Sequence, residues 1–406
     1  MSGKTSFSDN LENLLFNLVS INSANPDYSA AAPGEKEIGR FIYDFFTGCK
    51  IDCVKQNTID GRFNVIAKVE GKKSAPAIVL CSHLDTVYLD GMDFKPFMDD
   101  INIYGPGSCD TKASVAMMMS ALINYSKKSS GRDLNVYFAG VVSEESRHIG
   151  IRKLIEEFDS YIGRADFFII GEPTNLDIGI AHKGSLKFTI KTKGKNAHGS
   201  TPHLGLNAIN MMGELIVAIN NEIVPEYDRT ADELLGKPTI NIGTISGGSA
   251  FNIVPDNCCI EIDRRMLPSE TVKQVLDRFL ELIDMLKKDR AKSLGKEQGR
   301  AQENKGPAFD GAIDMVKDYI PYLMIDKDNK FLKSFERVCK DVYKKSLIVG
   351  LPYATDGGFS SEFGIPTVVF GPGDINNCHR LEEFVSRKQL RLGTMILSDY
   401  LSSAVL

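Results

Sequence analysis

The chain has 406 residues, of which 43% are hydrophobic and 25% charged; this composition is typical of globular proteins, and the length exceeds that of one hydrophobic core. The formal net charge of -5 provides no basic surface for nucleic acid or for an acidic membrane. No apolar run is long enough to span a bilayer, and the start of the chain lacks the apolar core of a signal peptide, so we expect a cytoplasmic protein.

Four short apolar stretches without alternation predict strands that are covered on both faces. They are residues 77–81, 136–142, 167–170 and 367–370. Apolar residues at helical spacing predict helices at residues 112–126 and 149–158. Strands that alternate with helices predict an α/β domain of three layers, with a mostly parallel sheet between the helices. Ligands bind to such sheets beyond the carboxyl ends of the strands.

Side chains that commonly bind metals follow each of the four predicted strands. They are His83, Glu144, Glu145, Glu172 and His379. Neighbouring side chains diverge after a strand, so one carboxylate of the Glu144 and Glu145 pair can bind metal while the other faces a substrate. Nitrogen and oxygen ligands of this kind suit zinc, with cobalt or manganese as substitutes. The sequence therefore predicts a centre with two divalent ions.

Two aspartates extend this predicted centre. Asp110 lies in a glycine-rich turn before the helix at 112–126, where a sharp bend can present its carboxylate as a bridge between two ions. Asp85 and His83 project from the same side of an extended chain, so Asp85 can accept a hydrogen bond from the imidazole.

Each motif has a structural explanation when it is taken alone. A His-x-Asp motif is more often a hydrogen-bonded pair, a Glu-Glu pair usually lies on a solvated face, and residues 171–174 could form a plain turn. The hypothesis of a metal centre depends on their joint order after apolar stretches, in a chain with only 6 histidines. A binding protein without turnover is the other class of function, and it would have lost a ligand or Glu144.

A change of pattern indicates a second domain. Residues 185–193 alternate between apolar and polar side chains, as in an antiparallel strand with one wet face. Strands at 240–245 and 259–262 and helices at 207–219 and 271–286 are also predicted. We expect a smaller α+β domain at 183–320, inserted into a metal-binding domain of 1–182 and 321–406. The polar residues 287–306 predict a solvated helix end and a mobile loop.

The motifs resemble those of the dinuclear zinc hydrolases that include acetylornithine deacetylase, succinyl-diaminopimelate desuccinylase, aminoacylase and glutamate carboxypeptidase. The resemblance covers nearly the whole chain and rests on residues 82–87, 107–112, 143–145, 171–174 and 371–373 with His379. It implies that one zinc is held by His83 and Glu172 and the other by Glu145 and His379, with Asp110 as the bridge.

The same resemblance implies the catalytic roles. A hydroxide would bridge the two ions, Glu144 would be the general base, and Asp85 would orient His83. Ser82, Tyr88 and Thr111 depart from the residues that are common in the family. None of these departures removes a ligand.

Residues 194–202 and 205–209 resemble the smaller domain of the family, which acts as a lid and forms the dimer interface. The resemblance implies that His198 reaches the active site of a partner subunit and stabilises charge on the scissile carbonyl oxygen. Without this resemblance, His198 would be better interpreted as a histidine in a turn. Asn252 and Arg265 match substrate-binding positions, and Arg265 is the candidate for holding a carboxylate through two parallel hydrogen bonds. A homodimer is therefore expected.

The expected activity is metal-dependent removal of an N-acyl group, most simply acetyl, from an amino acid. This expectation rests on local likeness to acetylornithine deacetylase at residues 170–174, 181–184 and 371–379. Desuccinylase, di- or tripeptidase and carboxypeptidase activities use the same centre and remain alternatives. The expected partner is a small N-acyl amino acid or short peptide, with no nucleic acid and no membrane.

Overall fold

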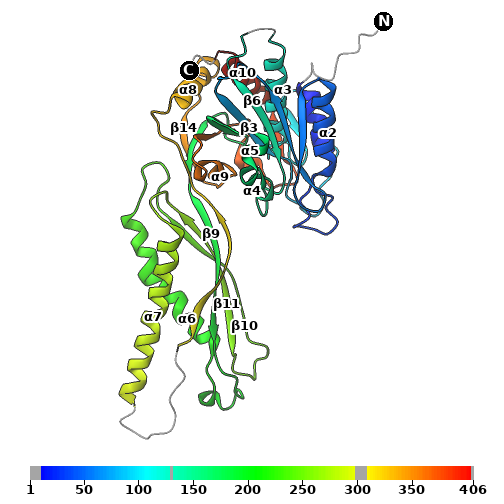
Figure 1. The fold of residues 1–406 in the computed structure, drawn as a ribbon. Coiled ribbons are helices and arrows are strands. Elements are labelled where there is room, and N and C mark those ends of the chain that lie inside the picture. The colour runs from blue at the N-terminus through cyan, green and yellow to red at the C-terminus, as the bar shows by residue number, and fades with distance from the viewer. Residues whose placement is uncertain (1–10, 129–130, 298–308, 404–406) are drawn as a thin grey trace. The chain divides into compact units, whose positions relative to one another are not determined.

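The computed structural model describes residues 11–128, 131–297 and 309–403, and it divides the chain into two compact units (Figure 1). The large unit consists of Met1–His182 and Leu323–Leu406, and the inserted unit consists of Lys183–Tyr322. The sequence predicts the corresponding boundaries at 182/183 and 320/321.

A mixed sheet forms the centre of the large unit. Its nine strands, among the residues described, follow the order β1-β2-β6-β3-β7-β15-β8-β13, and β14 pairs with β8. Strands β6, β3, β7 and β15 are parallel neighbours, and these are the four strands that the apolar stretches predict. The bounds are β1 (Asp52–Asn57), β2 (Phe63–Val69), β3 (Ala77–His83), β6 (Asn135–Val141), β7 (Phe167–Ile170), β8 (Ile178–His182), β13 (Leu323–Met324), β14 (Ile348–Leu351) and β15 (Thr367–Val369).

The helices of the large unit lie on both faces of this sheet. Phe167 of β7 stacks on Phe331, with ring centroids 5.6 Å apart. Side chains alternate along a strand, so the neighbouring Phe168 points to the opposite face, where its ring lies 6.3 Å from Phe158. The predicted three-layer α/β fold is therefore confirmed. The helices are α1 (Leu11–Ser20), α2 (Lys36–Gly48), α3 (Lys112–Ser126), α4 (Ile149–Glu156), α5 (Phe158–Tyr161), α8 (Lys330–Val342), α9 (Gly357–Glu362) and α10 (Arg387–Ser403).

The predicted helix at 112–126 is α3, which has the same bounds. Its residues are almost all buried, because α1 and α10 pack on it from outside while it packs on β3 and β6. The predicted helix at 149–158 is two helices, α4 and α5, with a break at Glu157. The buried Ile151 and Leu154 of α4 lie about one turn apart, as the apolar spacing predicts.

The inserted unit has a four-stranded antiparallel sheet in the order β10-β11-β9-β12. Figure 1 shows two helices, α6 and α7, along one face of it. Phe188 of the sheet and Phe279 of α7 meet edge to face in the core, with ring centroids 5.0 Å apart. The bounds are β9 (Gly184–Lys193), α6 (Ala208–Ala218), β10 (Thr239–Gly247), β11 (Asn257–Met266), α7 (Val272–Glu297) and β12 (Gly311–Ile320).

Two details of the inserted unit differ from the sequence predictions. The polar face of β9 is not fully wet, because Thr189 is 4% exposed in a strand that lies between β11 and β12. Helix α7 continues to Glu297, past the predicted end at 286, so the first part of the polar segment 287–306 is helical. The remainder, residues 298–306, lies outside the described residues.

A small sheet, β16-β5-β4, lies apart from the two larger sheets. Its strands are β4 (Phe97–Met98), β5 (Asn102–Tyr104) and β16 (Phe384–Ser386). The other elements are short helical segments: η2 (Pro202–Leu204), η3 (Ile219–Ile223), η4 (Val224–Arg229) and η5 (Ile375–Asn377). Within the parts of the chain that the structure describes, every helix is too short or too polar to cross a membrane.

Candidate metal centre

The side chains predicted to bind metal come together at the carboxyl ends of the parallel strands. His83 is the last residue of β3, while Glu144 and Glu145 follow the end of β6 and Glu172 follows the end of β7. Because β3 lies between β6 and β7, residues that leave these strands at the same edge are close in space. His379 reaches this edge from the loop that follows β15.

Asp110 lies between the two histidines. His83 Nε2 is 3.1 Å from Asp110 Oδ1, and His379 Nε2 is 3.2 Å from Asp110 Oδ2. Glu172 Oε1 is 3.7 Å from His83 Nε2, and Glu145 Oε1 is 3.3 Å from His379 Nε2. The five side chains thus form two half-sites that share Asp110. Each half-site adds one imidazole and one further carboxylate.

The carboxylates of these half-sites concentrate negative charge in a buried place. Burial, assisted by repulsion from Asp110 and Glu144, raises the pKa of Glu172 well above its ordinary value, although His83 opposes the shift. Burial and the charge of Asp110 also raise the pKa of Glu145. Cations stabilise buried carboxylates that lie close to one another. Imidazole and carboxylate donors are the ligands that divalent ions such as zinc accept, so the residues present fit a pair of such ions.

The surrounding carboxylates raise the pKa of both imidazoles. Hydrogen bonds with Asp110 and Glu145 raise the pKa of His379 to about 11. Burial opposes the charged form of His83, but the carboxylates of Glu172 and Asp110 outweigh it and raise its pKa well above the ordinary value. The protein itself therefore favours positive charge at both histidines, as expected where cations belong.

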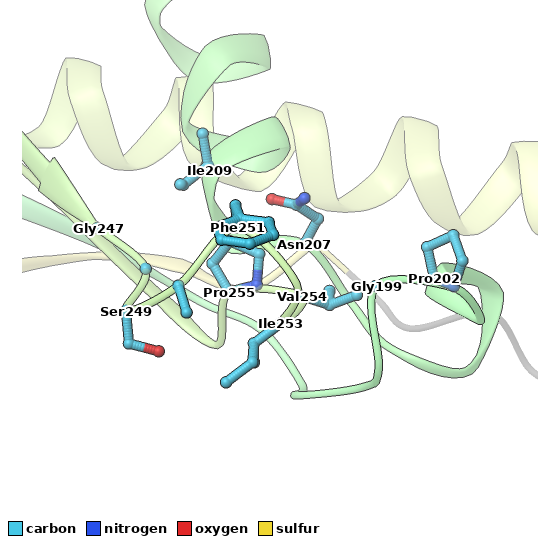
Figure 2. A pocket seen from close by; sticks show the side chains of 12 residues that line it. Gly199, Pro202, Asn207, Ile209, Gly247, Ser249, Phe251, Ile253, Val254 and Pro255 are labelled. Carbon is cyan, nitrogen blue, oxygen red and sulfur yellow. The ribbon is translucent and has the colours of Figure 1, made fainter.

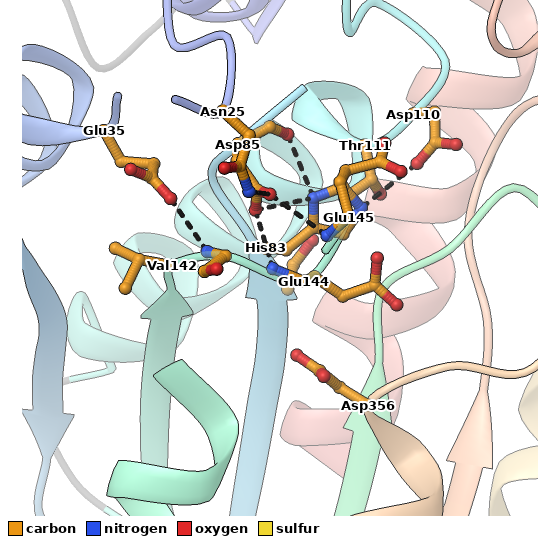
Figure 3. Close-up of polar contacts among 12 residues, drawn as sticks. Asn25, Glu35, His83, Asp85, Asp110, Thr111, Val142, Glu144, Glu145 and Asp356 are labelled. Carbon is orange, nitrogen blue, oxygen red and sulfur yellow. Dashed lines mark hydrogen bonds and ion pairs between the residues drawn. The ribbon is translucent and has the colours of Figure 1, made fainter. Parts of the chain in front are cut away.

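Asp85 supports a larger part of the site than the sequence predicts. The closest acceptor for His83 Nδ1 is the backbone oxygen of Asp85 at 3.0 Å, and the Asp85 carboxylate lies 3.5 Å away. That carboxylate accepts hydrogen bonds from the backbone N–H groups of Glu144 and Glu145, both at 3.0 Å (Figure 3). Asn25 donates to it as well, at 2.8 Å. Asp85 therefore fixes the backbone of the two glutamates in addition to flanking the His83 ring.

A backbone hydrogen bond closes the turn that carries the two glutamates. The backbone oxygen of Ser143 accepts a hydrogen bond from the N–H of His148 at 2.6 Å, and the Ser143 N–H donates to Glu35 at 2.8 Å. Ser143 and His148 have φ of 63° and 54°. This left-handed conformation is uncommon for residues other than glycine, and such residues gather at functional sites. Sequence reasoning missed Glu35, which lies 108 positions away from the turn.

The loop that carries Asp110 is held by Glu383, another residue that sequence reasoning missed. The Glu383 carboxylate accepts hydrogen bonds from the backbone N–H groups of Gly107, Cys109 and Asp110, at 2.8 to 2.9 Å. Burial and the nearby charge of Asp110 raise the pKa of Glu383 to about 7, while the three N–H donors oppose the shift. The only sequence signal was its position shortly after His379.

Glu144 lies beside a second cluster that the sequence analysis did not identify. His148 Nδ1 is 2.9 Å from Asp356 Oδ1 and 3.9 Å from Glu144 Oε1. Burial raises the pKa of Glu144 to about 8; His148 and His83 oppose this shift, whereas Asp356 and Glu145 add to it. A histidine four residues after Glu144, in a chain with 6 histidines, was the available signal.

The three residues predicted to contact substrate lie in the inserted unit. His198 is exposed, and its Nδ1 accepts a hydrogen bond from the backbone N–H of Ser200 at 3.1 Å. Because a backbone N–H can only donate, the ring proton resides on Nε2, which is left as a donor. Asn252 is exposed on the adjacent loop, where its backbone oxygen accepts from Gly199 at 2.7 Å. Arg265 is half-buried on β11 and pairs with Asp263 at 2.9 Å.

Next to this loop is a cavity of about 560 Å³ within the inserted unit (Figure 2). It is lined by residues of the turns on either side, among them Gly199, Asn207, Phe251 and Pro255. Phe251 is fully exposed, and Ile209 and Ile253 are each 40% exposed. Exposed apolar side chains that lie together are typical of surfaces that bind other molecules.

Comparison with known proteins identifies relatives of this chain. Residues 180–291 match the model of a peptidase dimerisation domain, and residues 64–210 match that of peptidase family M28. The chain is 31% identical to an acetylornithine deacetylase of Photorhabdus laumondii over 333 residues, which cover 80% of this chain and 78% of the relative. It is 24% identical to a probable succinyl-diaminopimelate desuccinylase of Staphylococcus epidermidis, with 93% of each chain covered.

Among solved structures, aminopeptidase PepT from Bacillus cereus has the same fold, with a TM-score of 0.74 at 21% identity, covering 97% of this chain and 98% of that one. The similarity to the deacetylase extends over most of both proteins. The chain therefore belongs to the M20 family of metallopeptidases and deacylases, and it is a hydrolase of amide bonds.

Proposed function

We propose that this protein removes an N-acyl group, most simply acetyl, from an amino acid, and that two divalent ions serve the reaction. His83 and Glu172 would hold one ion, Glu145 and His379 the other, and Asp110 would bridge them. The observation that carries the proposal is the placement of Asp110, whose two oxygens face different imidazoles at 3.1 and 3.2 Å. The donor set suits zinc, with cobalt or manganese as substitutes.

Ions bound in this way acidify water and polarise a carbonyl oxygen. The protein's own contribution to proton transfer is Glu144, which would take a proton from the attacking water and give it to the leaving amine as the C–N bond breaks. Burial raises the pKa of this carboxyl, and a general base works best when its pKa lies near the working pH. Asp85 supports this role because it fixes the backbone at Glu144.

His198 would stabilise the developing charge on the carbonyl oxygen through its Nε2–H group. The hydrogen bond from Ser200 to Nδ1 supports this role, because it sets the required tautomer. We place this histidine in the active site of a second copy, since the dimerisation-domain match spans it. The exposed side chains of Ile209, Phe251 and Ile253 would be covered in such a homodimer.

The substrate would be recognised by its free carboxylate. Arg265 presents a planar pair of donors at the surface of β11, and its partner Asp263 is also part-exposed, so the pair can open for a ligand. Asn252 would add a hydrogen bond to the same substrate. The names of the relatives support an acetyl or a succinyl group on the amine that is released.

Hydrolysis of a substrate panel by the zinc-loaded protein tests the proposal. The panel should hold N-acetyl and N-succinyl amino acids, dipeptides and tripeptides, with a Glu144→Gln protein as the control for contaminating activity. We expect the highest kcat/KM with an N-acetyl amino acid. Preference for a succinyl substrate or for a peptide would move the assignment within the family, and absence of turnover on all of them would contradict it.

A further inference from the structure

The turn that carries Glu144 is packed against a buried pair of side chains from two separate parts of the large unit. We propose that His148 and Asp356 form a positioning pair that holds the carboxylate of Glu144 in the direction required for proton transfer. The inference rests on the proposed function of Glu144. It concerns residues that neither the predicted ligand set nor the predicted catalytic set includes.

The pair itself is well defined. His148 is 4% exposed and Asp356 is 2% exposed, and His148 Nδ1 lies 2.9 Å from Asp356 Oδ1. Because a carboxylate accepts hydrogen bonds, the proton of the neutral ring resides on Nδ1. Phe359 closes the other side of the imidazole, with ring centroids 5.4 Å apart. The imidazole is thus fixed in direction by both a hydrogen bond and packing.

The same nitrogen faces Glu144. His148 Nδ1 lies 3.9 Å from Glu144 Oε1, and the three side chains offer ligand atoms within 4.8 Å of one another. Figure 3 shows Asp356 beside Glu144. The positive edge of the imidazole therefore attracts one oxygen of Glu144, which leaves its other oxygen for the water. Since the reacting atoms need a defined approach, an unsupported carboxylate would lower the rate at a given substrate occupancy.

The backbone at His148 offers a way to test the side chain alone. Its φ of 54° and ψ of 34° are left-handed, a conformation that glycine adopts freely and asparagine adopts more readily than most residues. A His148→Gly protein therefore loses the imidazole without new backbone strain. A His148→Asn protein keeps an N–H donor near the position of Nδ1. Lys50→Gly is the matched control, because Lys50 is also left-handed, with φ of 59°. Lys50 precedes β1, which runs in the same direction as β6, so it lies at the amino ends of the parallel strands, opposite the metal centre.

The experiment measures kcat, KM and bound zinc for these three proteins and the wild type, with the best substrate of the panel. We expect His148→Gly to lower kcat by about 10- to 100-fold while KM changes by less than about threefold and both ions stay bound. His148→Asn should recover most of the lost kcat, and Lys50→Gly should match the wild type. An unchanged kcat in His148→Gly would overturn the inference, and equal losses in the glycine and asparagine proteins would also overturn it.

Variants of Asp356 provide a second test of the pair. If Asp356 acts only through His148, Asp356→Ala should lower kcat by a similar factor, and the double variant with His148→Gly should lose no more than either single variant. A loss of kcat in the double variant equal to the product of the two single losses would mean that the residues act independently, and it would contradict the inference. Binding of a third ion that disappears in His148→Gly would also contradict it, because the cluster would then be a metal site. Lack of activity in the wild type counts against the proposed function instead.

Discussion

At the scale of single residues, two adjacent carboxylates of the proposed site face different histidines. Glu145 faces His379 at 3.3 Å, whereas the adjacent Glu144 faces His148 at 3.9 Å. The two side chains diverge as neighbours after a strand should, so the sequence was sufficient to predict that they face different groups.

We expect Glu144→Gln to lower kcat by about 10²- to 10⁴-fold, because glutamine has the same shape but cannot accept the proton of water. Zinc content measured by elemental analysis should stay at the wild-type value, since Glu144 is not among the five ligands. Loss of an ion in this variant would mean that Glu144 and Glu145 have the opposite roles.

Glu35 makes the stability of the protein depend on pH. Burial, together with the charge of Asp85, raises the pKa of Glu35 to about 7, although Arg62 and the Ser143 N–H oppose the shift. The folded protein therefore binds this proton more tightly than the unfolded chain does. The stability contributed by the group is present below its ordinary pKa of 4.5 and is lost as the pH rises through about 7.

Glu35→Gln removes this titration and keeps the shape of the side chain. We expect the thermal midpoint of wild type relative to Glu35→Gln to fall between about pH 4.5 and pH 7 and to level off above that range. Melting curves of both proteins across pH 4 to 8 check this. A constant difference between them would show that Glu35 titrates alike in the folded and unfolded chain.

The proposed ligands could be singled out from sequence because each follows an apolar strand or lies in a glycine-rich turn. The residues that support them could not. Glu383 and Asp356 come from loops that are distant in sequence from the groups they hold, at separations of 273 and 208 residues. A pattern in one stretch of chain contains no information about such contacts.

At the scale of elements, the precise end of β6 and the start of α4 determine where the glutamates lie. Gly150, near the start of α4, donates its N–H to the backbone oxygen of Val142 at 2.8 Å. A Cβ at this glycine would lie 2.3 Å from the Val142 nitrogen and 2.5 Å from its oxygen. Helix and strand therefore meet backbone to backbone, which only glycine permits.

We expect Gly150→Ala to lower the free energy of unfolding by about 1–3 kcal/mol, because helix α4 must move away from the strand. Denaturant unfolding measures the change. Gly48→Ala, at the end of α2 where nothing lies within 4 Å of the added Cβ, is the control and should be neutral or stabilising by up to about 1 kcal/mol. Equal stability of both variants would contradict the close approach at Gly150.

Elements that are long or strongly patterned were the predictable ones. The helix at 112–126 and the strand at 167–170 have the predicted bounds. Short edge strands such as β13 and β14 carry too few residues to show a period, and the break at Glu157 falls within an uninterrupted apolar pattern. The two strands depend on pairing with β8, which is distant in sequence, rather than on local preference.

At the scale of the whole molecule, our proposal divides one active site between two chains. The ligands and Glu144 belong to the large unit, and His198 belongs to the inserted unit. The change of hydrophobic period marked this division in the sequence. The arrangement of two chains was not predictable from pattern, because it depends on how complete surfaces fit together, and it entered only through the resemblance.

Mixing two inactive proteins tests the shared site. In a dimer of one Glu144→Gln chain and one His198→Ala chain, one of the two sites has both an intact Glu144 and an intact partner histidine. After subunit exchange at equal concentrations, we expect about a quarter of the wild-type activity, given that half of the dimers are mixed. If His198 acted within its own chain, both sites of each mixed dimer would keep one lesion, and the mixture would stay inactive.

The central claim is that five side chains hold two neighbouring cations, and anomalous diffraction at the zinc edge from zinc-loaded crystals tests it most directly. The account predicts two peaks on either side of the Asp110 carboxylate, one beside His83 and Glu172 and one beside Glu145 and His379, and both absent from Asp110→Ala crystals. A single peak, or peaks elsewhere, such as beside His148 and Asp356, would contradict it.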